Sequence, residues 1–185
     1  GIFHCAGAID DKLFTDPNYN WDKTWDCKAK SVEFLDKYSQ HMALDCFVLM
    51  SSLCGVFGNY GQSNYSAANS FLESFSEKKR QCGMVSTCIS WGPWIQVGMA
   101  SKDPQVLSQI LGRHVGGIDN EMGLNIIENV ISLSNVIASP FQWKSFLKIT
   151  NEQDSNKDIF SKFRHLNEEK SPELESPLRN MTKEE

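Results

Sequence analysis

A serine and a tyrosine flank a glycine-rich segment near the middle of the chain, and this order predicts chemistry at a carbonyl group. Ser52 follows an apolar run at 46–50 that we expect to form a buried strand, and Tyr65 opens a segment typical of a helix. The Tyr65 hydroxyl could donate a proton to a developing alkoxide, while the Ser52 hydroxyl could hold the same oxygen. The pattern indicates a reaction and not only a fold.

Such a tyrosine needs a neighbouring cation to exchange protons near neutral pH. The ordinary pKa of tyrosine is about 10, and a nearby positive charge lowers it by favouring the phenolate. Asn69 stands one helical turn after Tyr65 and shares its face, so this position supplies no charge. The chain must provide a lysine or an arginine from elsewhere.

The elements that must position these residues alternate between strand and helix. We expect strands at 2–5, 45–50, 85–91 and 135–139, helices at 21–38, 60–81, 104–112 and 120–133, and a turn or short helix at 140–147. This alternation predicts an α/β fold with a doubly wound parallel sheet. In the first helix, apolar spacing predicts five core side chains: Trp21, Trp25, Val32, Phe34 and Leu35.

Charge and hydropathy narrow the classes of partner. The 185 residues are 41% hydrophobic and carry a formal net charge of −5. An acidic balance disfavours nucleic acid as a ligand, and no apolar run approaches a membrane span. We interpret the basic run Lys78-Lys79-Arg80 as a solvated helix end, whose cations suit the helix dipole. We therefore expect neither nucleic acid nor membrane as a partner.

The six cysteines include no CxxC pair, and several lie inside apolar runs. This distribution disfavours a metal site, so we expect no bound metal. An ordinary core makes a disulfide framework unnecessary, which favours reduced thiols and a cytoplasmic location. The sequence contains no recognisable signal peptide.

Taken together, these residues resemble the ketoreductase domain of modular polyketide synthases and animal-type fatty acid synthases, a branch of the short-chain dehydrogenase/reductase family. Most members of that family carry a lysine one turn after the tyrosine, whereas the synthase ketoreductases have asparagine there and a lysine in the preceding helix. The resemblance assigns that lysine to Lys28, by its spacing to Ser52, with Lys30 as the second choice. It covers about residues 1–148 and implies a Rossmann-like sheet.

Four other segments carry the same resemblance: the strand and turn at 3–7, the strand end at 90–94, the start of a lid at 97–100, and the last strand at 136–143. The resemblance implies cofactor contacts at Ala6, Gly7, Lys28, Tyr65, Gly92 and Pro93. It implies substrate contacts at Asp11, Trp94 and Met99. Trp91 and Trp94 could instead belong to the core alone.

The implied reaction is reduction of a β-keto thioester to a 3-hydroxyacyl thioester by hydride transfer from NADPH, with NADH as the alternative. Tyr65 would donate the proton, Ser52 would hydrogen-bond the carbonyl oxygen, and Lys28 would lower the tyrosine pKa. Asn69 would orient Lys28 or a proton-relay water. The substrate would be attached as a thioester to the phosphopantetheine arm of an acyl carrier protein, in polyketide or fatty acid biosynthesis.

The stereochemical class is indicated by Ile9-Asp10-Asp11, which resembles the Leu-Asp-Asp signature of B-type ketoreductases. Phe57 stands where the other class carries tryptophan. The resemblance therefore favours a D-configured 3-hydroxyl. The alternative is that both aspartates are ordinary loop residues.

The extent of the chain also bears on function. Dinucleotide-binding folds need a glycine-rich turn after their first strand, and the sequence contains no such turn. The glycines Gly55, Gly58 and Gly61 have the spacing GxxGxxG, which indicates a flexible active-site loop and not a phosphate-binding turn. The chain also starts at Gly1 without methionine. We therefore expect the C-terminal part of a ketoreductase at 1–148, whose missing half lies in the rest of the synthase, followed by an acidic linker at 149–185 towards a carrier domain.

In that linker, Phe160, Phe163 and Leu166 could form one short helix. The isolated chain would be inactive. Two other functions remain open: a noncatalytic structural or docking element of a megasynthase, and a stand-alone short-chain reductase of small ketones.

Overall fold

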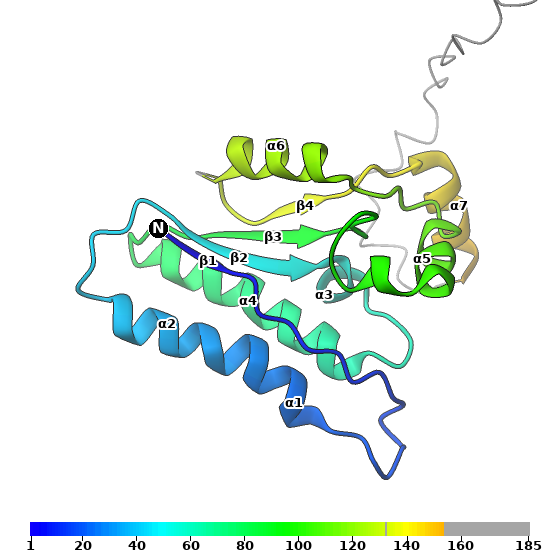
Figure 1. Cartoon of the computed structure of the whole chain (residues 1–185), viewed down its shortest axis with the longest axis horizontal. Helices are drawn as coiled ribbons and strands as arrows, with labels where there is room; N and C mark the ends of the chain where they lie inside the picture. The colour runs from blue at the N-terminus through cyan, green and yellow to red at the C-terminus, as the bar shows by residue number, and fades with distance from the viewer. Residues whose placement is uncertain (132, 154–185) are drawn as a thin grey trace, which may run out of the picture. The chain divides into compact units, whose positions relative to one another are not determined.

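A four-stranded parallel sheet forms the centre of the computed structural model, which describes residues 1–131 and 133–153. The strands are β1 (Ile2–His4), β2 (Phe47–Ser52), β3 (Thr87–Trp91) and β4 (Val136–Ala138). They lie in the order β1-β2-β3-β4, and every neighbouring pair is parallel (Figure 1). The α/β fold expected from the sequence is confirmed, and the carboxyl ends of the strands share one edge of the sheet.

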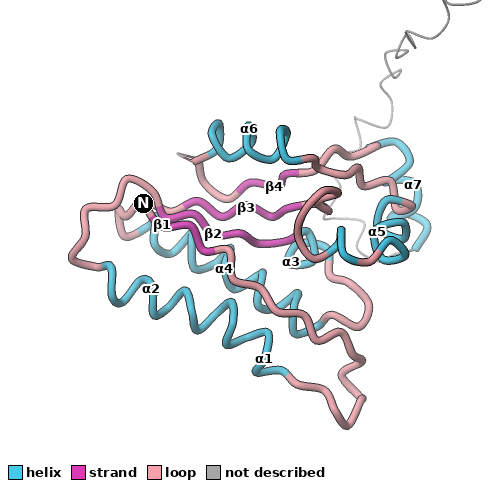
Figure 2. The backbone as a smooth tube through the Cα atoms, in the orientation of Figure 1, coloured by secondary structure: helices cyan, strands magenta, loops and turns pink. Residues whose placement is uncertain are grey.

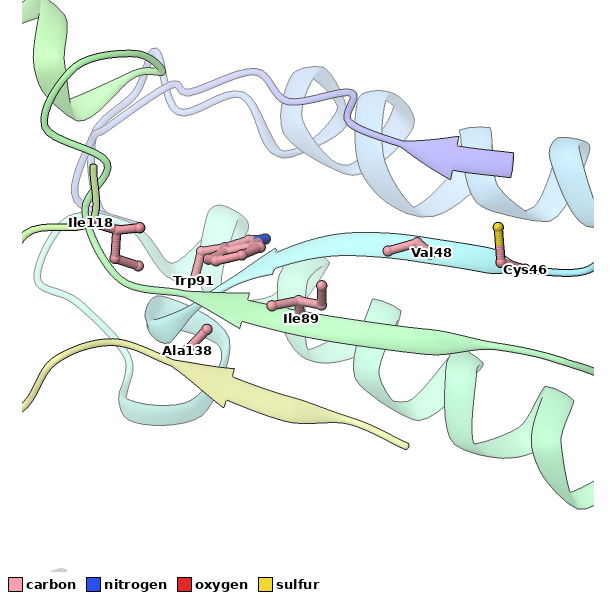
Figure 3. Packing of buried hydrophobic residues seen from close by; sticks show 6 residues of the cluster. All are labelled: Cys46, Val48, Ile89, Trp91, Ile118 and Ala138. Atoms are coloured by element: carbon pink, nitrogen blue, oxygen red, sulfur yellow. The ribbon is translucent and has the colours of Figure 1, made fainter. Parts of the chain in front are cut away.

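Alternating side chains of β2 build a separate core on each face of the sheet. Phe47 and Leu49 pack with Val32 and Leu72 from helices α2 (Ser31–Ser39) and α4 (Ser63–Gln81). On the other face, Val48 packs in a cluster with β3 and with helix α6 (Asn120–Val130), as Figure 3 shows for its buried members. Each fully buried side chain of this size contributes about 2 kcal/mol to folding. Both faces are therefore covered, as in a doubly wound sheet.

The helix expected at 21–38 consists of three pieces that continue without a break (Figure 2). A π turn (Asp26–Lys30) separates α1 (Trp21–Trp25) from α2. Two expected core positions are wrong, since Trp21 is 37% exposed and Phe34 is 57% exposed. Trp21 is the first residue of α1, and Phe34 lies two residues after the buried Val32 in the regular helix α2, so it is about 200° around the helix and faces away from the core.

Strand β2 runs into α4 through a short helix, α3 (Leu53–Phe57), that the sequence analysis missed. Gly55 lies in α3 and packs tightly on α4, because a Cβ there would lie 2.9 Å from the Asn69 Cβ. The expectation of a flexible loop is therefore wrong at Gly55. Gly58 and Gly61 have φ of 71° and 72°, so both occupy the left-handed region that favours glycine.

The basic run at the end of α4 is solvated as expected at Lys78 and Arg80, which are exposed, but the expectation is wrong for the buried Lys79. Lys79 is 7% exposed and forms an ion pair with Asp36 of α2. Its ammonium also lies 4.7 Å from the centroid of the Phe47 ring. Arg80 Nη1 donates to the backbone oxygens of Ser86 and Leu133. These cations hold α4 to its neighbours.

The segment that follows β3 contains a short 3₁₀ helix (Ala100–Lys102) and α5 (Pro104–Leu111). Helix α7 (Trp143–Gln153) belongs to a second compact unit, residues 142–185, and extends beyond the turn expected at 140–147. The short helix expected around 160–166 and most of the linker lie outside the described residues. Among the described helices, none has the length and hydropathy needed to cross a bilayer.

Candidate active site

The predicted catalytic side chains meet at the carboxyl end of the sheet. Ser52 is the last residue of β2, and Tyr65 lies in the first turn of α4. Lys28, on the π turn, places its ammonium 5.6 Å from the centroid of the Tyr65 ring. Asn69 and Ser52 both make polar contact with the Tyr65 side chain and act on its pKa. The structure therefore brings the four residues together.

Lys28 lies in an unusual environment for a lysine, being only 3% exposed. Its Nζ donates to the Met50 backbone oxygen at 2.8 Å. Burial lowers the pKa of Lys28 to about 8, because desolvation penalises the charged form. At neutral pH the side chain is still mostly an ammonium.

Lys30, the second choice, is unsuited to this position. It is exposed, and its ammonium pairs with the Asp26 carboxylate at 2.6 Å on the outer surface of the helix. The π turn directs Lys28 inward and Lys30 outward. The structure thus favours Lys28, as the sequence resemblance did.

Burial raises the pKa of Tyr65 to about 12, and polar contacts with Asn69 and Ser52 oppose this rise. The expected lowering of the tyrosine pKa by Lys28 stays a prediction, because in this structure burial dominates the pKa of Tyr65. The physical reason is that the phenol is desolvated, while the Lys28 ammonium hydrogen-bonds a backbone carbonyl. Tyr65 is consequently a neutral phenol at physiological pH, the form that can donate a proton.

The two adjacent serines at the end of β2 have different roles. Ser52 is half-buried, and its Oγ accepts the Cys54 backbone N–H at 3.3 Å, which caps α3. Ser51 is buried, and its Oγ lies 3.2 Å from the Asn69 backbone oxygen and 3.3 Å from Glu73 Oε1. Ser51 holds β2 to α4, which leaves Ser52 as the serine beside Tyr65.

Glu73 is a site-supporting residue that the sequence analysis missed. Its carboxylate accepts the Ser90 hydroxyl of β3 at 2.6 Å and lies beside Ser51 of β2. It therefore links the ends of the two central strands. Its spacing was a usable signal, because Tyr65, Asn69 and Glu73 follow one another at helical-turn intervals on one face of α4.

Asn69 is fully buried and points its amide into the site. Its Nδ2 donates to the Tyr65 backbone oxygen at 2.8 Å. Its Oδ1 is buried without a hydrogen-bond partner among the described residues. A buried acceptor of this kind is normally satisfied, so it marks a place where a polar group is expected.

The predicted cofactor contacts divide into exposed and buried positions. Ala6 and Gly7 are exposed at the end of β1, and a Cβ on Gly7 would lie 3.8 Å from Lys28 Cε and 3.5 Å from Met99 Cε. Gly92 and Pro93 are buried at the end of β3. A Cβ on Gly92 would lie 2.3 Å from Ser139 Oγ, so close strand packing already requires glycine there.

The predicted substrate contacts lie at different depths. Met99 is exposed above the turn at Gly7. Asp11 Oδ2 accepts from Gln62 Nε2 at 2.7 Å. Burial is the main cause of the raised pKa of Tyr65, and the charge of Asp11 adds only a small part to it. Trp94 packs edge-on against Trp91, with ring centroids 5.1 Å apart, and covers Gly123 of α6. The contacts of Trp94 are those of a core residue, and its substrate contact stays a prediction.

No group of histidine, cysteine, aspartate and glutamate suited to a metal ion occurs among residues 1–131 and 133–153. The titratable side chains of the site instead form a lysine–tyrosine pair with a serine and an asparagine. Such a set can hold and protonate an oxygen atom.

Comparison with known proteins identifies the class. The family model of the KR domain matches residues 1–96, and the chain therefore belongs to the KR, or ketoreductase, domain family. Among solved structures, "A-type Ketoreductases from Modular Polyketide Synthase" superpose with a TM-score of 0.76 at 29% identity, covering 83% of this chain and 33% of that chain. "The first ketoreductase of the tylosin PKS" gives 0.72 at 28% identity, covering 81% and 34%. The Rossmann-like fold is thereby confirmed.

Individual relatives are large synthases. The spectinabilin polyketide synthase system protein NorB of Streptomyces orinoci is 29% identical over 145 residues, covering 77% of this chain and 7% of that protein. The highly reducing polyketide synthase easB of Emericella nidulans is 33% identical over 132 residues, covering 71% and 5%. The chain thus spans less than a tenth of the length of these two relatives.

Proposed function

We propose that this chain carries the proton-transfer part of a ketoreductase that reduces a β-keto thioester to a 3-hydroxyacyl thioester with NADPH, or alternatively NADH. The observation that carries the proposal is the buried lysine beside the tyrosine. Lys28 and Tyr65 come from different helices, yet the ammonium lies 5.6 Å from the ring centroid. Burying an ammonium without a carboxylate is costly, and such costs are typical of functional sites.

Each side chain has a definite task in this proposal. Tyr65 donates its phenolic proton to the carbonyl oxygen, while Ser52 hydrogen-bonds the same oxygen as its negative charge develops. The Lys28 ammonium stabilises the phenolate left on Tyr65. Asn69 offers its unpartnered Oδ1 to a proton-relay water. A reduced nicotinamide supplies the hydride when it is bound.

The position of the turn after β1 supports binding of such a cofactor. The exposed turn at Ala6 and Gly7 adjoins Lys28, so backbone and ammonium donors lie at one edge of the site. Gly92 and Pro93 would form its wall at the end of β3. We propose that these residues, with Lys28 and Tyr65, hold the cofactor. Preceding parts of the protein would supply the glycine-rich turn.

The setting of the reaction is also a proposal. The relatives named above are polyketide synthases, which supports a place in a larger synthase and an acyl carrier protein as the partner that delivers the substrate. We propose that residues 1–148 are the catalytic part and that 149–185 form the linker, although helix α7 crosses this boundary. Asp11 beside the site supports a B-type product with a D-configured 3-hydroxyl.

The test is reduction of a β-keto thioester by the full-length protein that contains this chain, followed as loss of NADPH absorbance. Tyr65→Phe should lower kcat by about 100-fold or more, because it removes the proton donor. Unchanged reduction by Tyr65→Phe would favour the noncatalytic docking element. Chiral chromatography of the product tests the B-type assignment, and the isolated chain should show no turnover.

A further inference from the structure

His4 and Ser31 hold the helical turn that carries Lys28, and the mechanism above uses neither. We propose that this pair positions Lys28 beside Tyr65 by fixing the π turn against strand β1. The inference rests on the proposed function, because the position of Lys28 matters for catalysis only if Tyr65 transfers a proton. Both residues act through Lys28 and are therefore positioning residues.

Ser31 closes the π turn with its backbone and its side chain. Its backbone N–H donates to the backbone oxygens of Asp26 and Lys28. Its Oγ lies 2.5 Å from the Cys27 backbone oxygen and 3.1 Å from that of Lys28. A π turn is a rare departure from the regular helical hydrogen-bond pattern. The hydroxyl therefore supports the carbonyl groups on both sides of Lys28.

His4 anchors this serine to the sheet. It ends β1, is 3% exposed, and places Nε2 2.6 Å from Ser31 Oγ. A serine has one hydroxyl proton, and the Cys27 oxygen is the nearest acceptor, so His4 Nε2 carries a proton and donates to Oγ. Burial, together with the charge of Lys28, lowers the pKa of His4 and keeps the imidazole neutral.

The second ring nitrogen argues against a purely structural role. His4 Nδ1 is buried and has no hydrogen-bond partner among the described residues. An unpaired buried acceptor destabilises the fold, whereas an apolar side chain of similar size would not. Retaining histidine here is explained by the bond that Nε2 makes to the lysine-bearing turn.

Loss of the anchor would move the lysine. A π turn holds one residue more than an α-helical turn, so relaxation to a regular helix would rotate Lys28 relative to Tyr65. Lys28 Nζ donates to the Met50 backbone oxygen, and the side chains that face it are His4, Cys5, Cys27, Tyr65 and Cys88. None of these side chains is a carboxylate, so the ammonium is held by one hydrogen bond to a neutral oxygen and by the geometry of the turn.

The experiment compares variants of the full-length protein in NADPH-dependent reduction of a β-keto thioester, from neutral to alkaline pH. His4→Phe and Ser31→Ala should each lower kcat about 10- to 100-fold with little change in KM, because misplacing a catalytic group costs rate. The alkaline limb of their pH profiles should also shift from that of the wild type. His4→Gln and Ser31→Thr keep a donor and a hydroxyl, and should restore most of the activity.

A matched control is available on the same helix. Ser39 is also buried, and its Oγ donates to the Asp36 backbone oxygen at 3.3 Å, at the end of α2 distant from Lys28. Ser39→Ala should retain wild-type kcat. The kcat of the double variant of His4→Phe and Ser31→Ala should be no lower than that of the less active single variant, because both substitutions break the same hydrogen bond.

Hydrogen exchange of the same variants separates positioning from unfolding. Loosening confined to peptides around 26–31 supports the proposal, and loss of protection across β2 and α4 as well contradicts it. Effects on kcat no greater than that of Ser39→Ala would also overturn it. If the wild type reduces no β-keto thioester, the proposed function fails instead, and hydrogen exchange alone decides whether His4 holds the turn.

Discussion

Two buried lysines at different places in this fold show how differently a protein can handle the same side chain. Lys79 pairs with the Asp36 carboxylate and lies over the Phe47 ring, between helices α4 and α2. Lys28 is equally buried, but within residues 1–131 and 133–153 the hydrogen-bond partner of its ammonium is the neutral Met50 carbonyl oxygen. The Asp36 carboxylate balances the charge of Lys79, whereas the charge of Lys28 meets only a neutral carbonyl oxygen.

We propose that this difference separates a structural lysine, Lys79, from a functional one, Lys28. A buried ammonium that meets a carboxylate recovers much of its desolvation cost, so its burial is weak evidence of function. Burial lowers the pKa of Lys28 to about 8, so this lysine retains an electrostatic cost that folding alone does not require. That cost is expected where a positive charge must act on a neighbouring group, here Tyr65.

The largest expected effect comes from Lys28→Met. This change removes the cation but keeps a long apolar side chain, so kcat for thioester reduction should fall by about 100-fold or more. The stability of the surrounding elements should be unchanged or higher, because an uncompensated buried charge is removed. Kinetics and hydrogen exchange on the same full-length sample measure both. A large loss of protection in α4 would mean that Lys28 is structural.

Lys79→Met should have the opposite result. It leaves the Asp36 carboxylate without its partner in a half-buried position and should destabilise the α2–α4 region by about 2 kcal/mol, with kcat retained. Hydrogen exchange of α2 peptides reports the change. A second substitution, Asp36→Leu, should recover part of the loss. A selective loss of kcat without local destabilisation would remove the contrast between the two lysines.

The pH dependence gives the next largest effect. Because Lys28 must be protonated to act on Tyr65, kcat should fall about tenfold per pH unit above the lysine pKa of about 8. The effect on stability has the opposite sign. The folded pKa lies below the ordinary 10.5, so between these values the unfolded chain binds more protons and stability rises with pH, by at most about 3 kcal/mol.

Profiles of kcat and of local hydrogen exchange against pH test the expected fall in kcat and the expected rise in stability. The Lys28→Met variant is the control, since it should lose the rise in stability. Ionisation of Tyr65 affects these profiles only at higher pH, because burial raises its pKa to about 12. A wild-type kcat that stays level well above the lysine pKa would contradict the requirement for a charged Lys28.

The smallest effect is expected for Lys30→Ala. Lys30 is exposed, and its pair with Asp26 lies on the helix surface, where such pairs contribute little. Both kcat and stability should match the wild type within error. A substantial loss of activity would show that the sequence alternative, Lys30 in place of Lys28, was correct.

Local pattern predicted more of the sheet than of the helices. The four strands appear close to their expected positions, because apolar runs bounded by polar segments are sufficient to define buried parallel strands. The π turn was not predicted, and Trp21 and Phe34 were assigned to the core although both are exposed. A periodic pattern assumes a regular helix and cannot anticipate an inserted residue.

The candidate site also contains residues that the sequence predicted and contacts that it did not. Ser52, Tyr65, Asn69 and Lys28 were predicted as a set from their order and spacing, and the structure brings them together. Glu73 and the connection from His4 to Ser31 were not predicted, because they join residues from separate elements. Likewise, the ion pair of Lys79 with Asp36 could not be inferred from a basic run alone.

The sequence by itself predicted the class of fold, the family and a set of candidate proton-transfer residues, because residue type, order and hydrophobic period are local properties. Only the tertiary structure decided which lysine lies buried beside Tyr65. Lys28, Lys30 and Lys79 have the same chemistry, yet desolvation, solvent exposure and pairing with a carboxylate set their three different states. Those quantities depend on neighbours that come from distant parts of the chain, so they exist only once the chain has folded.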